Sequence, residues 1–110
     1  MRQAAIYYKG EKAGILKQHD DGSFTFRYLE MWLSDPQNPS ISLTLPRSQP
    51  VYHSKYLFPF FYNMLPEGTN RQKVCKAKRL DTDDYFGILM TTARYDTVGA
   101  ITVEKIKESV

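Results

Sequence analysis

The sequence predicts an α+β domain in which an antiparallel sheet of about five strands carries two to three short helices on one side. Two observations lead to this fold class. In the first half of the chain, apolar and polar residues alternate with the period of two that is typical of a strand with one buried face. In the second half, apolar residues recur at the three- and four-residue spacings of a helix. With 110 residues, the chain is expected to form a single domain over 1–110.

The first three strands are expected to form an antiparallel meander. The turns between them contain Gly10 and the Asp21-Gly22 pair, and glycine tolerates the positive φ of a tight hairpin. In the third strand, Phe24 and Phe26 alternate with polar residues, so that one face would be buried. The predicted strands cover residues 4–8, 13–17 and 23–28, and the first turn covers 9–12.

A fourth strand is expected over 41–45, after a loop rich in Pro, Asn, Asp and Ser. The alternation there is regular and Pro46 closes it, which places Leu43 and Leu45 on the inner face of the sheet. The segment 47–53 that follows is expected to be irregular.

The second half is expected to hold the helices and a closing strand. An apolar face predicts a first helix, which either begins after Ser54 as its cap or begins at Pro59, where proline is favoured. Its apolar face consists of Leu57, Phe60, Phe61, Met64 and Leu65. A second helix is expected from a cap at Thr69 or Asn70 through Leu80, and a third over 83–93 from a cap at Asp81 or Thr82. A turn at 95–96 would then lead into a strand over 97–104.

The sequence contains none of the common motifs of catalysis or cofactor binding. It lacks a glycine-rich phosphate loop, the catalytic motifs of protein kinases and a C-x-x-C pair, and His19 and His53 lie far apart. We therefore predict no catalytic, cofactor-binding or metal-binding residue, and no enzyme activity. A single cysteine, Cys75, favours a reducing cytoplasm, and the lack of a long apolar run predicts no membrane span.

Two features could serve as contacts to a partner protein. The first is the loop between the first two helices, which is either a plain connection or a loop presented to a partner. It consists of Leu65, Pro66, Glu67, Gly68, Thr69 and Asn70. The second feature is Trp32, which either anchors an interface or, as a lone tryptophan among apolar neighbours, completes the core.

Two charged clusters have a structural and a functional interpretation. A basic segment without any acid is either a solvated helix face or a phosphate-binding surface, and it consists of Arg71, Lys73, Lys76, Lys78 and Arg79. Direct contact with DNA is the less favoured interpretation, since exposed aromatic residues do not alternate with these cations. The acidic group Asp81, Asp83 and Asp84 lies at an expected helix start, where helix capping explains it better than metal binding.

Several segments together resemble the N-terminal region of HipA-family toxin kinases. The most specific are Ser42-Leu43-Thr44-Leu45-Pro46 and Phe60-Phe61-Tyr62-Asn63-Met64-Leu65-Pro66-Glu67-Gly68. The others are 13–16, 22–28, 32–33, 84–89 and 96–101, in the order of the family.

The resemblance implies a function through another protein. Members of this family continue into a kinase domain, which we expect to be absent here together with every catalytic and ATP-binding residue. Free-standing versions resemble the small, HipS-type subunit of three-part toxin–antitoxin systems, in which a separate HipA-like kinase is the toxin and a helix-turn-helix protein binds DNA. The resemblance thus implies docking on that kinase, with the loop 66–70 directed towards its active-site cleft. There are two alternatives: a fragment or structural N-terminal part of a HipA-type kinase, and a nucleic-acid-binding module that acts through 71–79.

Overall fold

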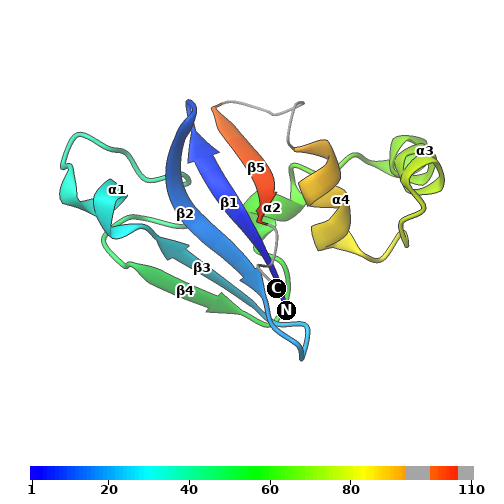
Figure 1. Ribbon diagram of the computed structural model, residues 1–110, viewed down its shortest axis with the longest axis horizontal. Coiled ribbons are helices and arrows are strands. Elements are labelled where there is room, and N and C mark those ends of the chain that lie inside the picture. The colour runs from blue at the N-terminus through cyan, green and yellow to red at the C-terminus, as the bar shows by residue number, and fades with distance from the viewer. Residues whose placement is uncertain (94–99, 107–110) are drawn as a thin grey trace.

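A computed structural model of the chain describes residues 1–93 and 100–106. These residues form five strands and four helices in an α+β arrangement, which confirms the predicted fold class (Figure 1). The strands are β1 (Arg2–Tyr8), β2 (Glu11–Gln18), β3 (Phe24–Tyr28), β4 (Val51–Ser54) and β5 (Ile101–Ile106). The helices are α1 (Glu30–Ser34), α2 (Pro59–Tyr62), α3 (Gly68–Lys78) and α4 (Tyr85–Thr92). The short α1 is an additional helix that the sequence pattern did not predict.

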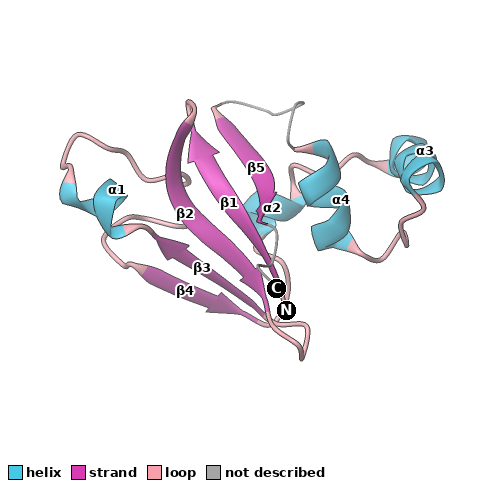
Figure 2. Cartoon of the chain, in the orientation of Figure 1, coloured by secondary structure: helices cyan, strands magenta, loops and turns pink. Residues whose placement is uncertain are grey.

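The sheet is antiparallel throughout and has the order β4-β3-β2-β1-β5 (Figure 2). The turn between β1 and β2 is shorter than expected, since Tyr8 pairs with Glu11. Its two central residues, Lys9 and Gly10, both have positive φ, at 49° and 84°. This is the backbone of a two-residue hairpin whose twist matches that of the strands.

A β-bulge interrupts the pairing of β1 with β2. Ile6 pairs with Gly14, but Tyr7 pairs with Lys12, which leaves Ala13 as the extra residue of β2. The carbonyl of Ala13 accepts a hydrogen bond of 2.8 Å from the N–H of Leu29, just before α1. The bulge therefore fixes the start of α1 against the sheet.

The core lies between one face of the sheet and the helices α2 and α4. Phe26 of β3 and Phe61 of α2 are fully buried, with ring centroids 5.9 Å apart. Phe24 of β3 meets Phe86 of α4 edge to face at 5.7 Å. These aromatic pairs join each helix to the sheet, as the predicted arrangement of helices over one face requires.

The segment 41–45 does not form a strand, so that prediction was wrong. Ser42 and Leu45 form an isolated bridge around a tight turn. The Tyr28 hydroxyl accepts a hydrogen bond from the N–H of Ile41 and donates one to the carbonyl of Leu45, which draws both ends of the segment together. Leu45 is buried as expected, but Leu43 is 100% exposed at the tip of the turn and not on the inner face of the sheet.

The region expected to be irregular contains a strand instead. β4 pairs with β3, with Phe24 opposite Ser54 and Arg27 opposite Val51. This strand is at the edge of the sheet and none of its residues is fully buried. An edge strand with two partly wet faces has little apolar alternation, which explains why the sequence pattern did not indicate it.

Helix α2 begins at Pro59, which confirms the second of the two expected starts. The caps predicted for the later helices were wrong. α3 begins at Gly68, so that Thr69 and Asn70 lie inside its first turn, and α4 is capped by Asp84 instead of Asp81 or Thr82. The turn at 95–96 and the first part of the expected closing strand lie outside the described residues, and β5 begins at Ile101.

Helix α3 lies at one end of the molecule, which measures 42 × 29 × 26 Å (Figure 1). Of its 11 residues, Cys75 alone is fully buried. None of the helices in the described part of the chain combines the length and apolar character that crossing a membrane requires.

Candidate functional site

The loop 65–70, which connects α2 to α3 and includes the first turn of α3, is buried at its start and exposed from Glu67 onward. Leu65 is 5% exposed and belongs to the core, whereas Glu67, Gly68, Thr69 and Asn70 are exposed. Gly68 has a φ of +55°, in the left-handed region that favours glycine. The loop therefore presents a short polar segment on a defined backbone.

Arg71 fixes the other end of the loop. Its Nε donates a hydrogen bond of 3.0 Å to the carbonyl of Pro66. Its guanidinium lies 5.5 Å from the ring centroids of both Tyr62 and Tyr85, and these two rings meet edge to face at 5.3 Å. Arg71 thus connects α2, the loop and α4 by a hydrogen bond and two cation–π contacts. It is a structural residue and differs in this from the rest of the basic segment.

A hollow of about 310 Å³ adjoins this cluster. Its lining includes the buried side chains of Phe24, Leu57 and Phe86. Tyr56, which is 73% exposed, and Tyr62, which is 40% exposed, also line it. Exposed tyrosines around an apolar floor are typical of protein interfaces, because the ring supplies area and the hydroxyl stays hydrated.

Trp32 does not share this surface. It is 3% exposed, its Nε1 donates a hydrogen bond of 2.9 Å to the carbonyl of Pro39, and its ring lies 5.7 Å from that of Tyr8. The indole therefore completes the core, as the structural interpretation of this residue expected. It offers a partner almost no surface, and it lies apart from the loop 65–70.

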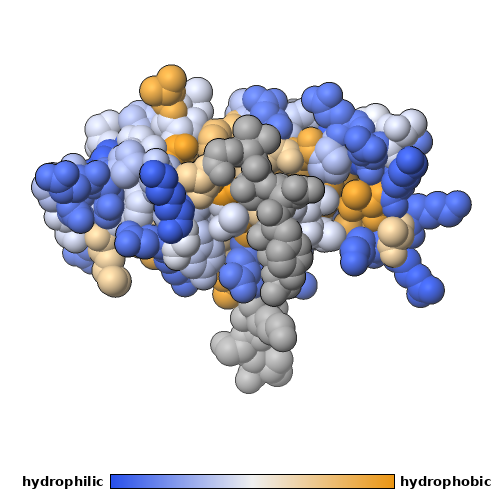
Figure 3. All heavy atoms as spheres, turned by 90° about the horizontal axis from the view of Figure 1, so that it is seen from above, coloured by the Kyte–Doolittle hydropathy of each residue, from blue (hydrophilic) through white to orange (hydrophobic). Residues whose placement is uncertain are grey.

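The remaining cations of the basic segment lie on α3 and at its C-terminal end. Lys73, Lys76, Lys78 and Arg79 are all exposed, and the α3 end of the molecule is mostly hydrophilic on the face seen in Figure 3. Arg79 ends the helix with a φ of 56°, and its N–H donates to the carbonyl of Cys75. Cations in the last turn of a helix complement its dipole, so the structural interpretation accounts for part of this charge.

Asp84 forms a bidentate ion pair with Arg2. Its carboxylate accepts two hydrogen bonds from the guanidinium of Arg2, at 2.6 and 3.0 Å, and caps α4 by accepting from the N–H of Gly87 at 3.1 Å. The helix-cap interpretation is thus correct for Asp84. A Cβ on Gly87 would lie 2.3 Å from the Asp84 Oδ2 atom, so this approach requires glycine. The described residues contain no group of three or more potential metal ligands.

The hydrogen bonds from Arg2 lower the pKa of Asp84. Partial burial raises this pKa, and the hydrogen bond from the Gly87 N–H lowers it further. A lowered pKa means that this carboxylate stabilises the fold above the unfolded-state pKa of about 3.9 and loses that contribution as the pH falls through its folded-state value. Because Arg2 is 37% exposed, solvent screens the pair, and we expect it to contribute about 1 kcal/mol.

We expect Asp84→Asn to be less stable than the parent protein at pH 7 and equally stable near pH 2, since Asn keeps the cap but not the charge. Urea denaturation across this pH range measures the difference. Asp83→Asn, at an exposed neighbouring position, is the matched control and should change little. A difference for Asp84→Asn that persists at pH 2 would exclude the ion pair as its cause.

Sequence reasoning missed both polar clusters. Arg2 and Asp84 are 82 residues apart, and the contacts of Arg71 with Tyr62 and Tyr85 depend on the packing of three helices. Neither cluster has a signal in the local sequence, because its residues come together only in the folded chain. The loop itself was found because Pro66 and Gly68 interrupt an apolar helical pattern.

Comparisons with known proteins agree on one relationship. A family model described as the HipA N-terminal domain matches residues 4–104. An uncharacterized protein of Haemophilus influenzae is 31% identical over 108 residues, which cover 98% of this chain and 96% of that protein. A solved structure of the N-terminal domain of HipA toxin superposes with a TM-score of 0.75 at 28% identity, over 99% of this chain and 96% of that one.

Two longer proteins of Sinorhizobium fredii also match. The putative kinase Y4mE is 27% identical over 89 residues, and the putative kinase Y4dM is 30% identical over 100 residues. The matches cover 81% and 86% of this chain but only 21% and 24% of those proteins. The chain therefore spans about a fifth to a quarter of these two relatives.

Proposed function

Because the chain belongs to the HipA N-terminal domain family, we propose that it is a non-catalytic module of a toxin–antitoxin system. It docks on a separate HipA-like Ser/Thr kinase and restrains its activity. The match to the Haemophilus influenzae protein over nearly its full length supports a small protein of this kind.

The observation that carries this proposal is the loop at 66–70. Its exposed residues lie between buried Leu65 and Arg71, which holds Pro66 and two tyrosine rings. A loop that is ordered before binding loses less conformational entropy when it docks. It can therefore enter a cleft of the kinase as a fixed obstacle to substrate, which is the steric mechanism we propose.

The tyrosine-lined hollow supplies the area that the loop lacks. A stable complex buries about 800 Å² on each partner, which is more than five loop residues offer. Tyr56 and Tyr62 are exposed beside the loop and extend the surface over the hollow. We expect the kinase to cover the loop and the hollow together in the cytoplasm. A helix-turn-helix DNA-binding protein is the proposed third member of the complex.

A second candidate function is that of a structural N-terminal part of a HipA-type kinase. The two Sinorhizobium fredii relatives favour it, because the matched segment is a minor part of each putative kinase. In that case, the chain would support the kinase and would not inhibit it. Growth of cells that express the kinase with and without this chain separates the two functions.

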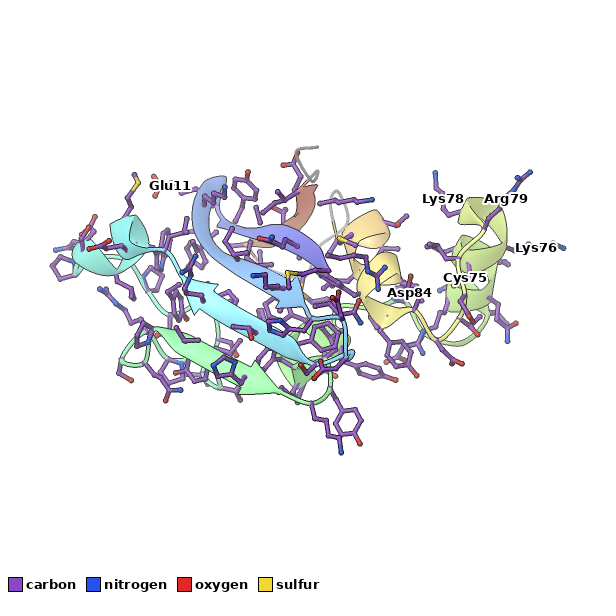
Figure 4. All side chains as sticks on the ribbon, turned by 60° about the horizontal axis from the view of Figure 1, so that its bottom comes forward. Glu11, Cys75, Lys76, Lys78, Arg79 and Asp84 are labelled. Carbon is purple, nitrogen blue, oxygen red and sulfur yellow. The ribbon has the colours of Figure 1, made fainter. Side chains whose placement is uncertain are left out.

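Charge reversal at the loop tests the proposal. We expect co-expression of this chain to relieve the growth arrest caused by its HipA-like partner kinase, and the two proteins to co-purify. Glu67→Lys should abolish the rescue and weaken co-purification at least tenfold. Glu67 is exposed in the free protein, and in the cleft of the kinase its charge would face groups of fixed position, which a reversed charge would no longer complement. Glu11→Lys is the matched control, since Glu11 is exposed at the opposite end of the molecule from α3 (Figure 4).

Each outcome has a definite meaning. Rescue by the parent chain and by Glu11→Lys, but not by Glu67→Lys, supports docking through the loop. Co-purification without rescue leaves docking intact and rejects restraint in favour of the structural function. If the parent chain and the kinase do not associate, the proposal fails.

A further inference from the structure

Helix α3 is polar apart from the side of Val74 and Cys75, and its cations have no acidic partner among the described residues. Its sequence from Gly68 to Lys78 contains no Asp or Glu, so no ion pair can form along the helix. Successive residues of a helix are offset by about 100°, so that Lys73 and Lys76, three residues apart, lie on one side and Lys78 on another. Buried Cys75 and the contacts of Arg71 hold the helix to the rest of the protein, while its exposed cations add little stability, so contact with another surface would stabilise it further.

The end of α3 borders a second hollow, of about 440 Å³. Lys78 of α3 and Lys105 of β5 line it, together with the aliphatic side chains of Leu80 and Met90. Arg2 also lines it, but Asp84 balances its charge. Among the described residues, neither Lys78 nor Lys105 forms a salt bridge.

The hollow thus combines positive charge with an apolar lining. Lys78 and Arg79 project from the end of α3, while Lys76 points away from the rest of the molecule (Figure 4). On the face seen in Figure 3, a small hydrophobic patch at the α3 end is surrounded by hydrophilic side chains. An anion alone would use only the charges, and an apolar ligand alone would use only the lining.

We propose that this basic hollow binds an acidic amphipathic segment of a partner protein. Carboxylates of the segment pair with Lys78 and Lys105, and an apolar side chain enters the hollow against Leu80 and Met90. The chemistry favours protein over nucleic acid, because the lining residues that the structure describes include no aromatic ring on which a base could stack. The two lysines of the hollow also come from different elements, α3 and β5, and do not continue the row that Lys73 and Lys76 form along α3, as contacts to a phosphate backbone would require.

This surface is distinct from the loop 66–70. The loop 66–70 includes the first turn of α3, whereas the basic hollow adjoins its last turn, so that Asn70 and Lys78 are separated by about 12 Å along the helix. Both surfaces can therefore be occupied at once. The basic hollow does not depend on the proposed docking to a kinase, and Glu67→Lys should leave binding at the hollow unchanged.

Peptide binding to the isolated protein tests the inference. A synthetic acidic helical peptide with leucines on one face should bind at low ionic strength, and binding should weaken as salt is added. The double variant Lys78→Glu/Lys105→Glu should bind it at least about tenfold more weakly. The matched control Lys9→Glu/Lys12→Glu changes the net charge equally at exposed positions of the β1–β2 hairpin and should bind like the parent protein. Circular dichroism checks that both double variants are folded.

Three results would overturn the inference. Equal weakening by both double variants would assign binding to net charge. Equal affinity for a peptide in which glutamine replaces the leucines would remove the role of the apolar lining. Salt-sensitive binding of a duplex DNA oligonucleotide without binding of the acidic peptide would assign the cations to nucleic acid. The expected contact should shift the NMR methyl signals of Leu80 and Met90 when the peptide is added, while the methyl signals of Leu43 stay unchanged.

Discussion

Phe61→Ala is expected to lower the free energy of unfolding by about 3–5 kcal/mol, because it removes a fully buried ring and leaves a cavity. Phe61 contacts Phe26 of the sheet at 5.9 Å and also Phe58 and Phe60 at 6.3 and 5.1 Å between ring centroids. Helix α2 has four residues and no side-chain cap, so it depends on this packing more than on its own hydrogen bonds.

Chemical denaturation followed by tryptophan fluorescence measures this loss, since Trp32 lies in the same buried cluster. The matched control is Met31→Ala, at a side chain that is 83% exposed, which should change stability by less than about 0.5 kcal/mol. A small effect at Phe61 would mean that α2 is not fixed by the sheet. The rigid presentation of the loop 66–70 would then lose its structural basis.

Gly14→Ala is expected to cost about 3 kcal/mol, although alanine is a smaller change than most core substitutions. A Cβ at Gly14 would lie 2.6 Å from the carbonyl oxygen of Arg27 and 2.7 Å from two ring atoms of Phe26. The oxygen belongs to the neighbouring strand β3, so it cannot move away without opening the sheet next to the bulge.

Gly10→Ala separates this steric effect from backbone strain. Gly10 has a φ of 84°, but nothing lies within 4 Å of a Cβ placed there. We expect a loss of about 1 kcal/mol at this position, from the left-handed backbone alone. Thermal unfolding of the two variants compares them directly. If Gly14→Ala were as stable as the parent protein, β2 and β3 would be farther apart at this point than the structure has them.

Sequence patterns predicted the parts of the fold in which local and tertiary preferences agree. In β3, buried residues alternate with less buried ones, and Pro59 marks the start of α2. In β1 and β2, the buried residues include neighbours in sequence, and the glycine turns that flank these strands carried the prediction. The same alternation over 41–45 was misleading, because a single hydroxyl of Tyr28 folds that segment into a turn. A hydrogen bond between residues that are distant in sequence leaves no periodic signal.

The candidate site was predictable only in its location. Pro66 and Gly68 indicated an interrupted connection between helices, but the contacts of Arg71 that hold it come from three separate elements. The basic segment was visible as a run of cations. Its division into one structural arginine and four exposed charges depends on how α3 is oriented towards Tyr62 and Tyr85.

The sheet order has a consequence for synthesis on the ribosome. β1 pairs with β2 on one side and with β5 on the other. The edge that pairs with β5 therefore has no partner until about 90 more residues have been synthesised. At ribosomal speeds of about 5–20 residues per second, β1 keeps an unpaired edge for roughly 5–20 s. During that time, strands β1 to β4 can form a meander that lacks its final member. Nascent chains of this protein should therefore need protection from pairing with one another until β5 has emerged.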